Sequence, residues 1–182
     1  MSVQREHRAK ATRRCVLAAT AIPCLPWCAI AEDDDEDDQP DPVVLGIALA
    51  TAPVTLEEAL HSAGQRGTPI SAKFDMRDGD LRLSVYAAAQ SGLIEVLVDP
   101  KTGAITALRP LTDPEDLAEA VAQQRVLETA KLPMNAVLQK LVADYPESRV
   151  VSVVPERRNG HPVLVMSLLS DGQLITTSAW LE

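Results

Sequence analysis

The sequence has few aromatic residues and no excess of positive charge. Aromatic side chains make up only 3% of the 182 residues, so a buried core has to be built from Val, Leu, Ile and Ala, and the apolar fraction of 46% is enough for one. The formal net charge is −9 at pH 7. Because a nucleic-acid partner needs a basic face on the protein, this balance argues against nucleic-acid binding.

Cysteine is absent beyond residue 28. The segment that holds all three cysteines has five Lys/Arg residues in its first 14 positions, then the mostly apolar stretch Cys15–Ile30, and it ends on Ala29-Ile30-Ala31. This order is typical of a secretory signal peptide, which we place at residues 1–31. A membrane anchor is the alternative. However, the apolar stretch has 16 residues with two prolines, whereas a spanning helix needs roughly 20 apolar residues.

Cleavage of this peptide would give an exported, periplasmic chain with no stable membrane anchor. Such a chain would contain no thiol, and therefore no disulfide and no thiolate chemistry. The pair Arg13-Arg14 also resembles a twin-arginine export motif. The general secretory route is favoured, but the sequence does not decide between the two routes.

Seven consecutive acidic residues, Glu32–Asp38, follow the predicted cleavage site. Like charges repel, and two prolines close behind the run favour an extended backbone. We therefore predict an acidic disordered spacer over residues 32–42. The alternative is a weak site for a divalent cation, although the run lacks the spaced ligands and turning glycines of an ordered Ca²⁺ site.

The rest of the chain shows one pattern twice. An amphipathic helix is followed by alternating strands that are separated by X-Gly turns. The two intervals between turn glycines are 13 and 12 residues, from Gly79 to Gly92 and from Gly160 to Gly172. The prediction is an α+β fold of two tandem small units, each with an α-helix packed on an antiparallel three- to four-stranded sheet. The units span residues 43–111 and 133–182, and a linking helix spans 112–132.

Two points of this organisation stay open at the level of sequence. The apolar, Ala-rich stretch Val43–Val54 fits either a strand or an ordered lead-in. The two small sheets could be separate or could merge into one.

This arrangement resembles the PepSY family of exported bacterial proteins. The resemblance is carried by an apolar strand that leads into an Asp-x-x-x-Gly turn, and by two shorter motifs. These segments are Leu56-Glu57-Glu58-Ala59-Leu60, Leu93–Gly103 and Asn159-Gly160-His161-Pro162-Val163. The second unit lacks the Asp-x-x-x-Gly turn. The resemblance implies a helix packed on a small antiparallel sheet, a role in peptidase inhibition or ligand sensing, and no shared catalytic residues.

No motif with catalytic or metal-binding spacing is present. Beyond residue 31 the only histidines are His61 and His161, and the sequence has no His-Glu-x-x-His, Gly-x-Ser-x-Gly or phosphate-loop pattern. The closely spaced carboxylates Asp78, Asp80 and Asp99 lie at turns, where aspartate usually caps its own backbone. We therefore expect a protein that is not an enzyme and has no cofactor and no metal site.

The segment Pro162–Leu169 is apolar at positions that face both sides of a strand. Either both faces are buried within the chain, or one face or edge is an interface that accepts a strand from a partner. The candidate partner-binding residues are Val163, Val165, Met166 and Leu168. The sequence thus favours a non-catalytic binding or modulatory protein with a protein or peptide partner. The alternative is a divalent-metal sensor that uses the acidic run, and the oligomeric state is open.

Overall fold

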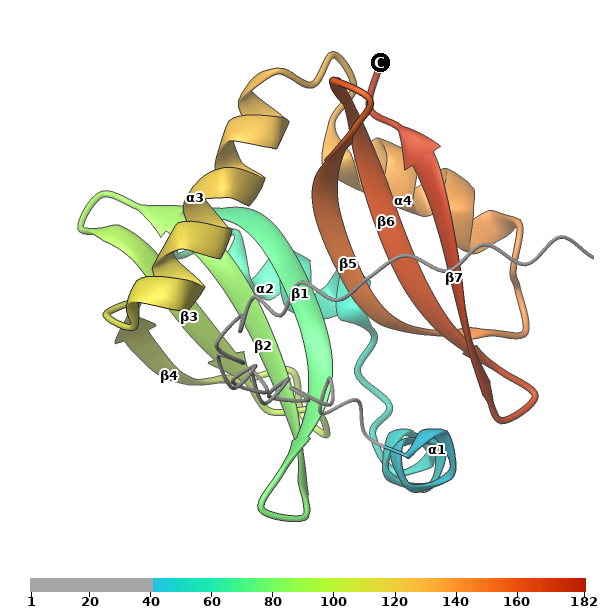
Figure 1. Ribbon diagram of the computed structural model, residues 1–182. Helices are drawn as coiled ribbons and strands as arrows, with labels where there is room; N and C mark the ends of the chain where they lie inside the picture. The colour runs from blue at the N-terminus through green and yellow to red at the C-terminus, as the bar shows by residue number, and fades with distance from the viewer. Residues whose placement is uncertain (1–40) are drawn as a thin grey trace, which may run out of the picture. The chain divides into compact units, whose positions relative to one another are not determined.

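The computed structural model describes residues 41–182, so the predicted signal peptide and acidic run lie outside the described residues. Four helices and seven strands form an α+β fold with a single antiparallel sheet in the order β4-β3-β2-β1-β5-β6-β7 (Figure 1). The helices are α1 (Pro42–Ala50), α2 (Leu56–Ala63), α3 (Pro114–Glu128) and α4 (Met134–Ala143). The strands are β1 (Thr68–Arg77), β2 (Asp80–Ala89), β3 (Gly92–Val98), β4 (Ile105–Pro110), β5 (Arg149–Arg158), β6 (His161–Ser170) and β7 (Gln173–Trp180).

The open question about Val43–Val54 is resolved by a short helix. Asp41 is the N-cap of α1, its side chain accepts a hydrogen bond from the Val43 amide at 2.8 Å, and Pro42 occupies the first helical position. Residues 41 and 42 are therefore structured, so the predicted spacer extends two residues too far. α2 begins with a capping box, because Thr55 and Glu58 each accept a hydrogen bond from the other's backbone amide.

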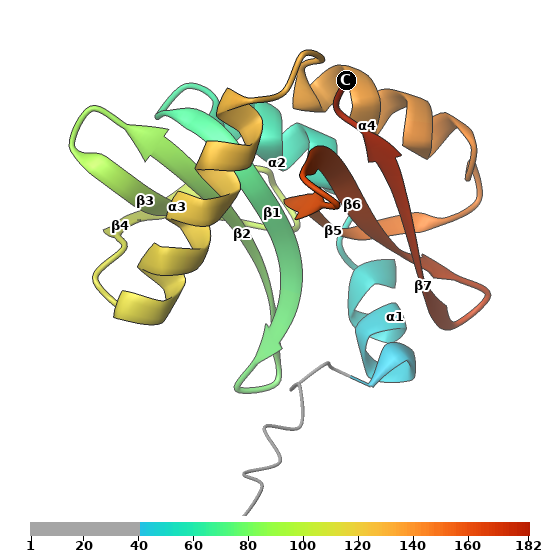
Figure 2. The ribbon, with the colours of Figure 1, turned by 45° about the horizontal axis from the view of Figure 1, so that its top comes forward.

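The helices cover the two faces of the sheet unequally (Figure 2). Buried residues of α1, α2 and α4 form one core cluster with strand residues such as Ala72, Leu83 and Met166. Ser71, the neighbour of Ala72, instead donates a hydrogen bond of 2.6 Å to Gln123 of α3. Since successive strand residues point to opposite faces, α3 lies on the other side of the sheet.

The strands of the second half repeat those of the first with a constant shift in number. β1 and β5 both have ten residues, as do β2 and β6. β5 begins and ends 81 positions after β1, and β6 begins and ends 81 positions after β2. The irregularity between Pro69 and Ser71 in β1 recurs between Val150 and Ser152 in β5. The buried residues of α2 and α4 share the spacing i, i+3, i+4, i+7.

The two halves meet where β1 pairs antiparallel with β5. The paired residues are Ala72 with Val153 and Lys73 with Ser152. Ala72 and Val153 are themselves related by the shift of 81, so the strand register has a local two-fold symmetry at this pair. The two predicted sheets are therefore parts of one continuous sheet.

The predicted linking helix is present as α3, capped by Asp113, whose carboxylate accepts hydrogen bonds from the amides of Glu115 and Asp116. Its buried residues are only Ala120, Gln123 and Val126. It contacts both β1 and β5 and so crosses the junction between the halves.

Candidate functional site

The four residues predicted to bind a partner are buried. Val163, Val165, Met166 and Leu168 are at most 8% exposed, and all four lie where β6 is paired with β5 on one side and β7 on the other. Met166 and Leu168 belong to the main core cluster. The structure thus has the first of the two alternatives, burial of both faces within the chain, and β6 has no free edge.

The free edges of the sheet, among residues 41–182, belong to β4 and β7. Free edges attract other strands, and proteins usually protect them with charge, proline or a bulge. β4 has all three forms of protection: Arg109, Pro110 and a register irregularity opposite Leu97/Val98.

β7 has none of these protections. Its sequence QLITTSAW contains no charged residue, no proline and no glycine. All eight of its residues pair with β6 in one uninterrupted register, from Ser170↔Gln173 to Val163↔Trp180. The edge of β7 is therefore regular and has no protecting residue of its own, although the guanidinium of Arg158 in β5 donates to the Ser178 hydroxyl at 3.2 Å. It is the first candidate interaction site.

The direction of the backbone groups on β7 follows from the ladder. Leu181 donates its amide hydrogen to the carbonyl of Pro162 at 2.9 Å. In an antiparallel pair the hydrogen-bonded positions alternate. Odd-numbered residues of β7 therefore direct their N–H and C=O groups toward β6, and even-numbered ones direct them outward. The outward set is Leu174, Thr176, Ser178 and Trp180.

The first half of the chain shows what such an edge can hold. Leu111 donates to the carbonyl of Leu93 at 3.0 Å, so by the same alternation Leu93, Glu95 and Leu97 direct their backbone groups toward β4. Shifted by 81 positions, these residues correspond to Leu174, Thr176 and Ser178. The edge of β7 thus repeats the edge of β3 that carries β4, and no described residue occupies the equivalent position beside β7.

The C-terminal end of β7 is fixed by a small polar cluster. Trp180 is 53% exposed and meets the ring of His161 edge to face, with 5.8 Å between centroids. His161 Nδ1 lies 2.8 Å from a carboxylate oxygen of Glu182, and this hydrogen bond holds the pKa of Glu182 below its ordinary value. Leu181 is fully buried, and its carbonyl accepts the amide of Lys131. An exposed indole is thereby held at one end of the free edge.

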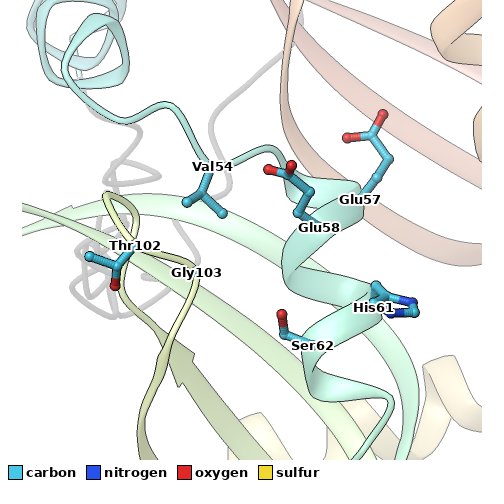
Figure 3. Close-up of a pocket in the computed structure, with 7 residues that line it drawn as sticks. All are labelled: Val54, Glu57, Glu58, His61, Ser62, Thr102 and Gly103. Atoms are coloured by element: carbon cyan, nitrogen blue, oxygen red, sulfur yellow. The ribbon is translucent and has the colours of Figure 1, made fainter.

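A surface hollow of about 480 Å³ lies between α2 and the turn after β3 (Figure 3). It is lined in part by Glu57, Glu58, His61 and Ser62. The Glu58 carboxylate already accepts the Thr55 amide, and among residues 41–182 neither the imidazole of His61 nor the hydroxyl of Ser62 has a hydrogen-bond partner. Since an activated serine needs a base within hydrogen-bond reach, this set has no nucleophile–base pair.

The remaining candidate polar groups have local structural roles. The Asp99 carboxylate accepts the amides of Lys101 and Thr102, and these bonds lower the pKa of Asp99. Asp78 occupies a hairpin turn with φ of 55°. Within residues 41–182 no group of three or more His, Cys, Asp or Glu side chains is arranged to hold a metal ion.

Comparison with known proteins gives no relative for this chain. No protein-family model, no curated protein and no solved structure matches it. Across the described part of the chain, no helix is long and apolar enough to cross a membrane.

Proposed function

We propose that this chain is a non-catalytic, exported binding or modulatory protein of the PepSY type, in which two tandem units share one sheet. Its partner is a protein or peptide, and the free edge of β7 is where the partner binds. The observation that supports this proposal is the repeated edge: β7 offers the same outward backbone positions by which β3 holds β4. Peptidase inhibition is the specific activity that the family resemblance suggests.

Binding by strand addition divides affinity and specificity between backbone and side chains. An extended segment that runs antiparallel to β7 would bond to the outward N–H and C=O groups of Leu174, Thr176 and Ser178. By strand alternation their side chains share a face with Trp180, and Ile175, Thr177 and Ala179 share the other face. Ile175 and Ala179 pack against the core cluster, and so does Leu174 at the start of the strand. The exposed indole of Trp180 would pack on an apolar or cationic side chain of the partner.

The test is recovery of a partner from periplasmic extract by the wild-type chain and by two variants. Thr176→Pro removes one outward N–H and no bond to β6, whereas Thr176→Ala keeps that N–H and changes only the side chain. A photocrosslinker at position 178 identifies partners that lie against the edge. Partners crosslinked to the wild type and to Thr176→Ala, and lost on Thr176→Pro, support the proposal. An undiminished yield on Thr176→Pro, or no crosslinked partner at physiological salt, would refute it.

A further inference from the structure

The free edge of β7 is complementary to itself. When two copies of β7 run antiparallel with Thr177 opposite Thr177, residues 173–181 of one copy all face residues 173–181 of the other. Thr176 then lies opposite Ser178, and Leu174 lies opposite Trp180. Because these four residues direct their backbone groups outward, each of these pairs is a hydrogen-bonded pair of the new ladder.

Other registers fit this edge less well. A shift by two residues in one direction places Trp180 opposite Gly172, which lies outside the strand. A shift by two residues in the other direction places Leu174 opposite Glu182, which also lies outside the strand. All three registers set hydroxyl groups opposite each other, but only the central register also sets the indole against an aliphatic side chain at both ends. Cross-strand pairs of these kinds stabilise a sheet.

We infer that two copies of this chain associate through their β7 edges, antiparallel about a two-fold axis at Thr177, so that one sheet continues through both. The fold already contains a junction of this type, since β1 and β5 pair antiparallel about the equivalent residues Ala72 and Val153. The dimer concerns the same edge as the proposed function but needs no other partner.

Charge sets the conditions under which this dimer forms. Each copy has a net charge of −9, yet β7 contributes no charge, so repulsion acts around the contact and not within it. At each end of the paired strands Glu182 of one copy approaches the turn that holds Asp171 of the other. Salt screens both effects, so the dimer strengthens as ionic strength rises.

An edge contact of this length is small beside the roughly 1,600 Å² of a standard stable interface. The dimer is therefore concentration-dependent.

The first measurement is sedimentation velocity of the purified chain over a wide range of concentration. The expected result is a shift from one copy to two, at lower concentration in high salt. Thr176→Pro should weaken the dimer at least about tenfold, which is a difference of about 1.4 kcal/mol, and Thr176→Ala should leave it nearly unchanged. Asp171→Asn should strengthen it. Circular dichroism of each variant shows that the fold is retained, and Ser178→Lys is the second disrupting variant in case Thr176→Pro fails to fold.

The register is tested by disulfide crosslinking in a chain whose three native cysteines are replaced by serine. Thr177→Cys places two thiols across the axis at a non-hydrogen-bonded pair, where the Cα atoms of opposed residues lie about 4.5 Å apart, within the range that a disulfide spans. Ala179→Cys lies on the same face but opposite Ile175, so it should crosslink poorly.

The outcomes separate this inference from the proposed function. A monomer at every concentration and salt, a dimer unaffected by both Thr176→Pro and Ser178→Lys, or equal crosslinking at 177 and 179 would overturn the dimer. A dimer that passes these tests while no partner is recovered leaves the inference intact and removes the proposed function. If both hold, a partner competes with the second copy, and recovery falls as the chain is concentrated.

Discussion

Arg149 is the residue that ties the loop between α1 and α2 to the second half of the sheet. Its guanidinium donates to the carbonyl of Ala52 at 2.6 Å and to that of Val54, and it lies over the ring of Phe74, 5.5 Å from the centroid. Burial lowers the pKa of Arg149, and the carboxylates of Glu57 and Glu58 oppose that shift. Both hydrogen bonds are donated by the same nitrogen, Nη2, while the Nε atom is buried without a partner.

We predict that Arg149→Met lowers the free energy of unfolding by about 2–4 kcal/mol, because two carbonyl oxygens lose a charged donor. Arg149→Lys should recover only part of this loss, since an ammonium can donate to carbonyls but does not stack its charge as a planar group over the Phe74 ring. Urea unfolding provides the measurement, and Arg77→Met, at an exposed position, provides the control with a change within about 0.5 kcal/mol. Equal effects of Arg149→Met and Arg77→Met would contradict the role given to Arg149.

Sequence reasoning at the residue scale succeeds where the cause is local. The turn residues Asp78 and Asn159 have positive φ, as the hairpin pattern predicts, and the Thr55–Glu58 capping box forms. Arg149 gives no such signal. Its acceptors lie about a hundred positions away in the chain, and nothing near Arg149 in the sequence distinguishes it from a solvent-exposed arginine.

At the scale of elements, α3 rests on a polar part of the sheet. Tyr86 of β2 is partly buried there, and burial raises its pKa to about 12, with Glu95 and Asp116 the largest of the nearby carboxylates that add to the shift. The Gln123 side chain links the two layers, since it accepts from Ser71 and donates to Glu119 at 2.7 Å. A negative charge on Tyr86 would therefore be unfavourable beneath this helix.

We predict that stability falls at high pH through Tyr86. Its pKa in the folded chain is about 12, against 10.0 for the unperturbed group. The contribution of neutral Tyr86 to the free energy of unfolding is thus complete below pH 10 and is lost as the pH rises toward 12. Urea midpoints measured across this interval should fall for wild type and Tyr145→Phe, and fall less for Tyr86→Phe. Tyrosinate absorbance in the Tyr145→Phe chain gives the pKa of Tyr86 directly, and an ordinary value there would contradict the prediction.

The elements that the sequence predicts well are those with a clear period. α2 and α4 have one apolar stripe each, and strands such as β2 and β3 alternate, while the apolar β6 is recognised by the Gly turns on both sides of it. α1 is missed because its residues are apolar on every side. Leu45 and Leu49 are buried while Val43, Val44 and Ile47 are exposed, so no helical period distinguishes it from a strand.

At the scale of the whole molecule, pairing between distant strands decides where the candidate site lies. The sequence of an apolar strand such as β6 fits equally well a strand inside the sheet or a strand at an interface with a partner. Only the pairing of β1 with β5 and of β6 with β7 places β6 inside the sheet and β7 at its edge. The absence of charge, proline and glycine from β7 is visible in the sequence. It becomes informative only when the strand is known to be an edge.

Whether the two halves unfold together depends on what crosses their junction. β1 and β5 share only two residue pairs, which alone would make a weak link. However, one core cluster contains residues of both halves, α1 contacts β2 and β7, and α3 contacts β1 and β5. Loss of either half would expose the apolar surface of the other, so residues 41–182 should unfold in one cooperative transition.

The test places a destabilising change in one half and a probe in the other. Phe74 of β1 is 3% exposed, and Phe74→Ala should lower the free energy of unfolding by about 3–5 kcal/mol. In a Trp27→Phe chain the fluorescence of Trp180 reports only on the second half. The unfolding free energy measured by Trp180 fluorescence should fall by this full amount, and amide exchange in β2 should report the same loss. Lys73→Ala, next to Phe74 but exposed, is the control and should change little. If the Trp180 transition stays at its wild-type midpoint while the amides of β2 exchange faster, each half folds alone. In a cooperative unit the loss of the Phe74 side chain lowers the stability of both halves equally.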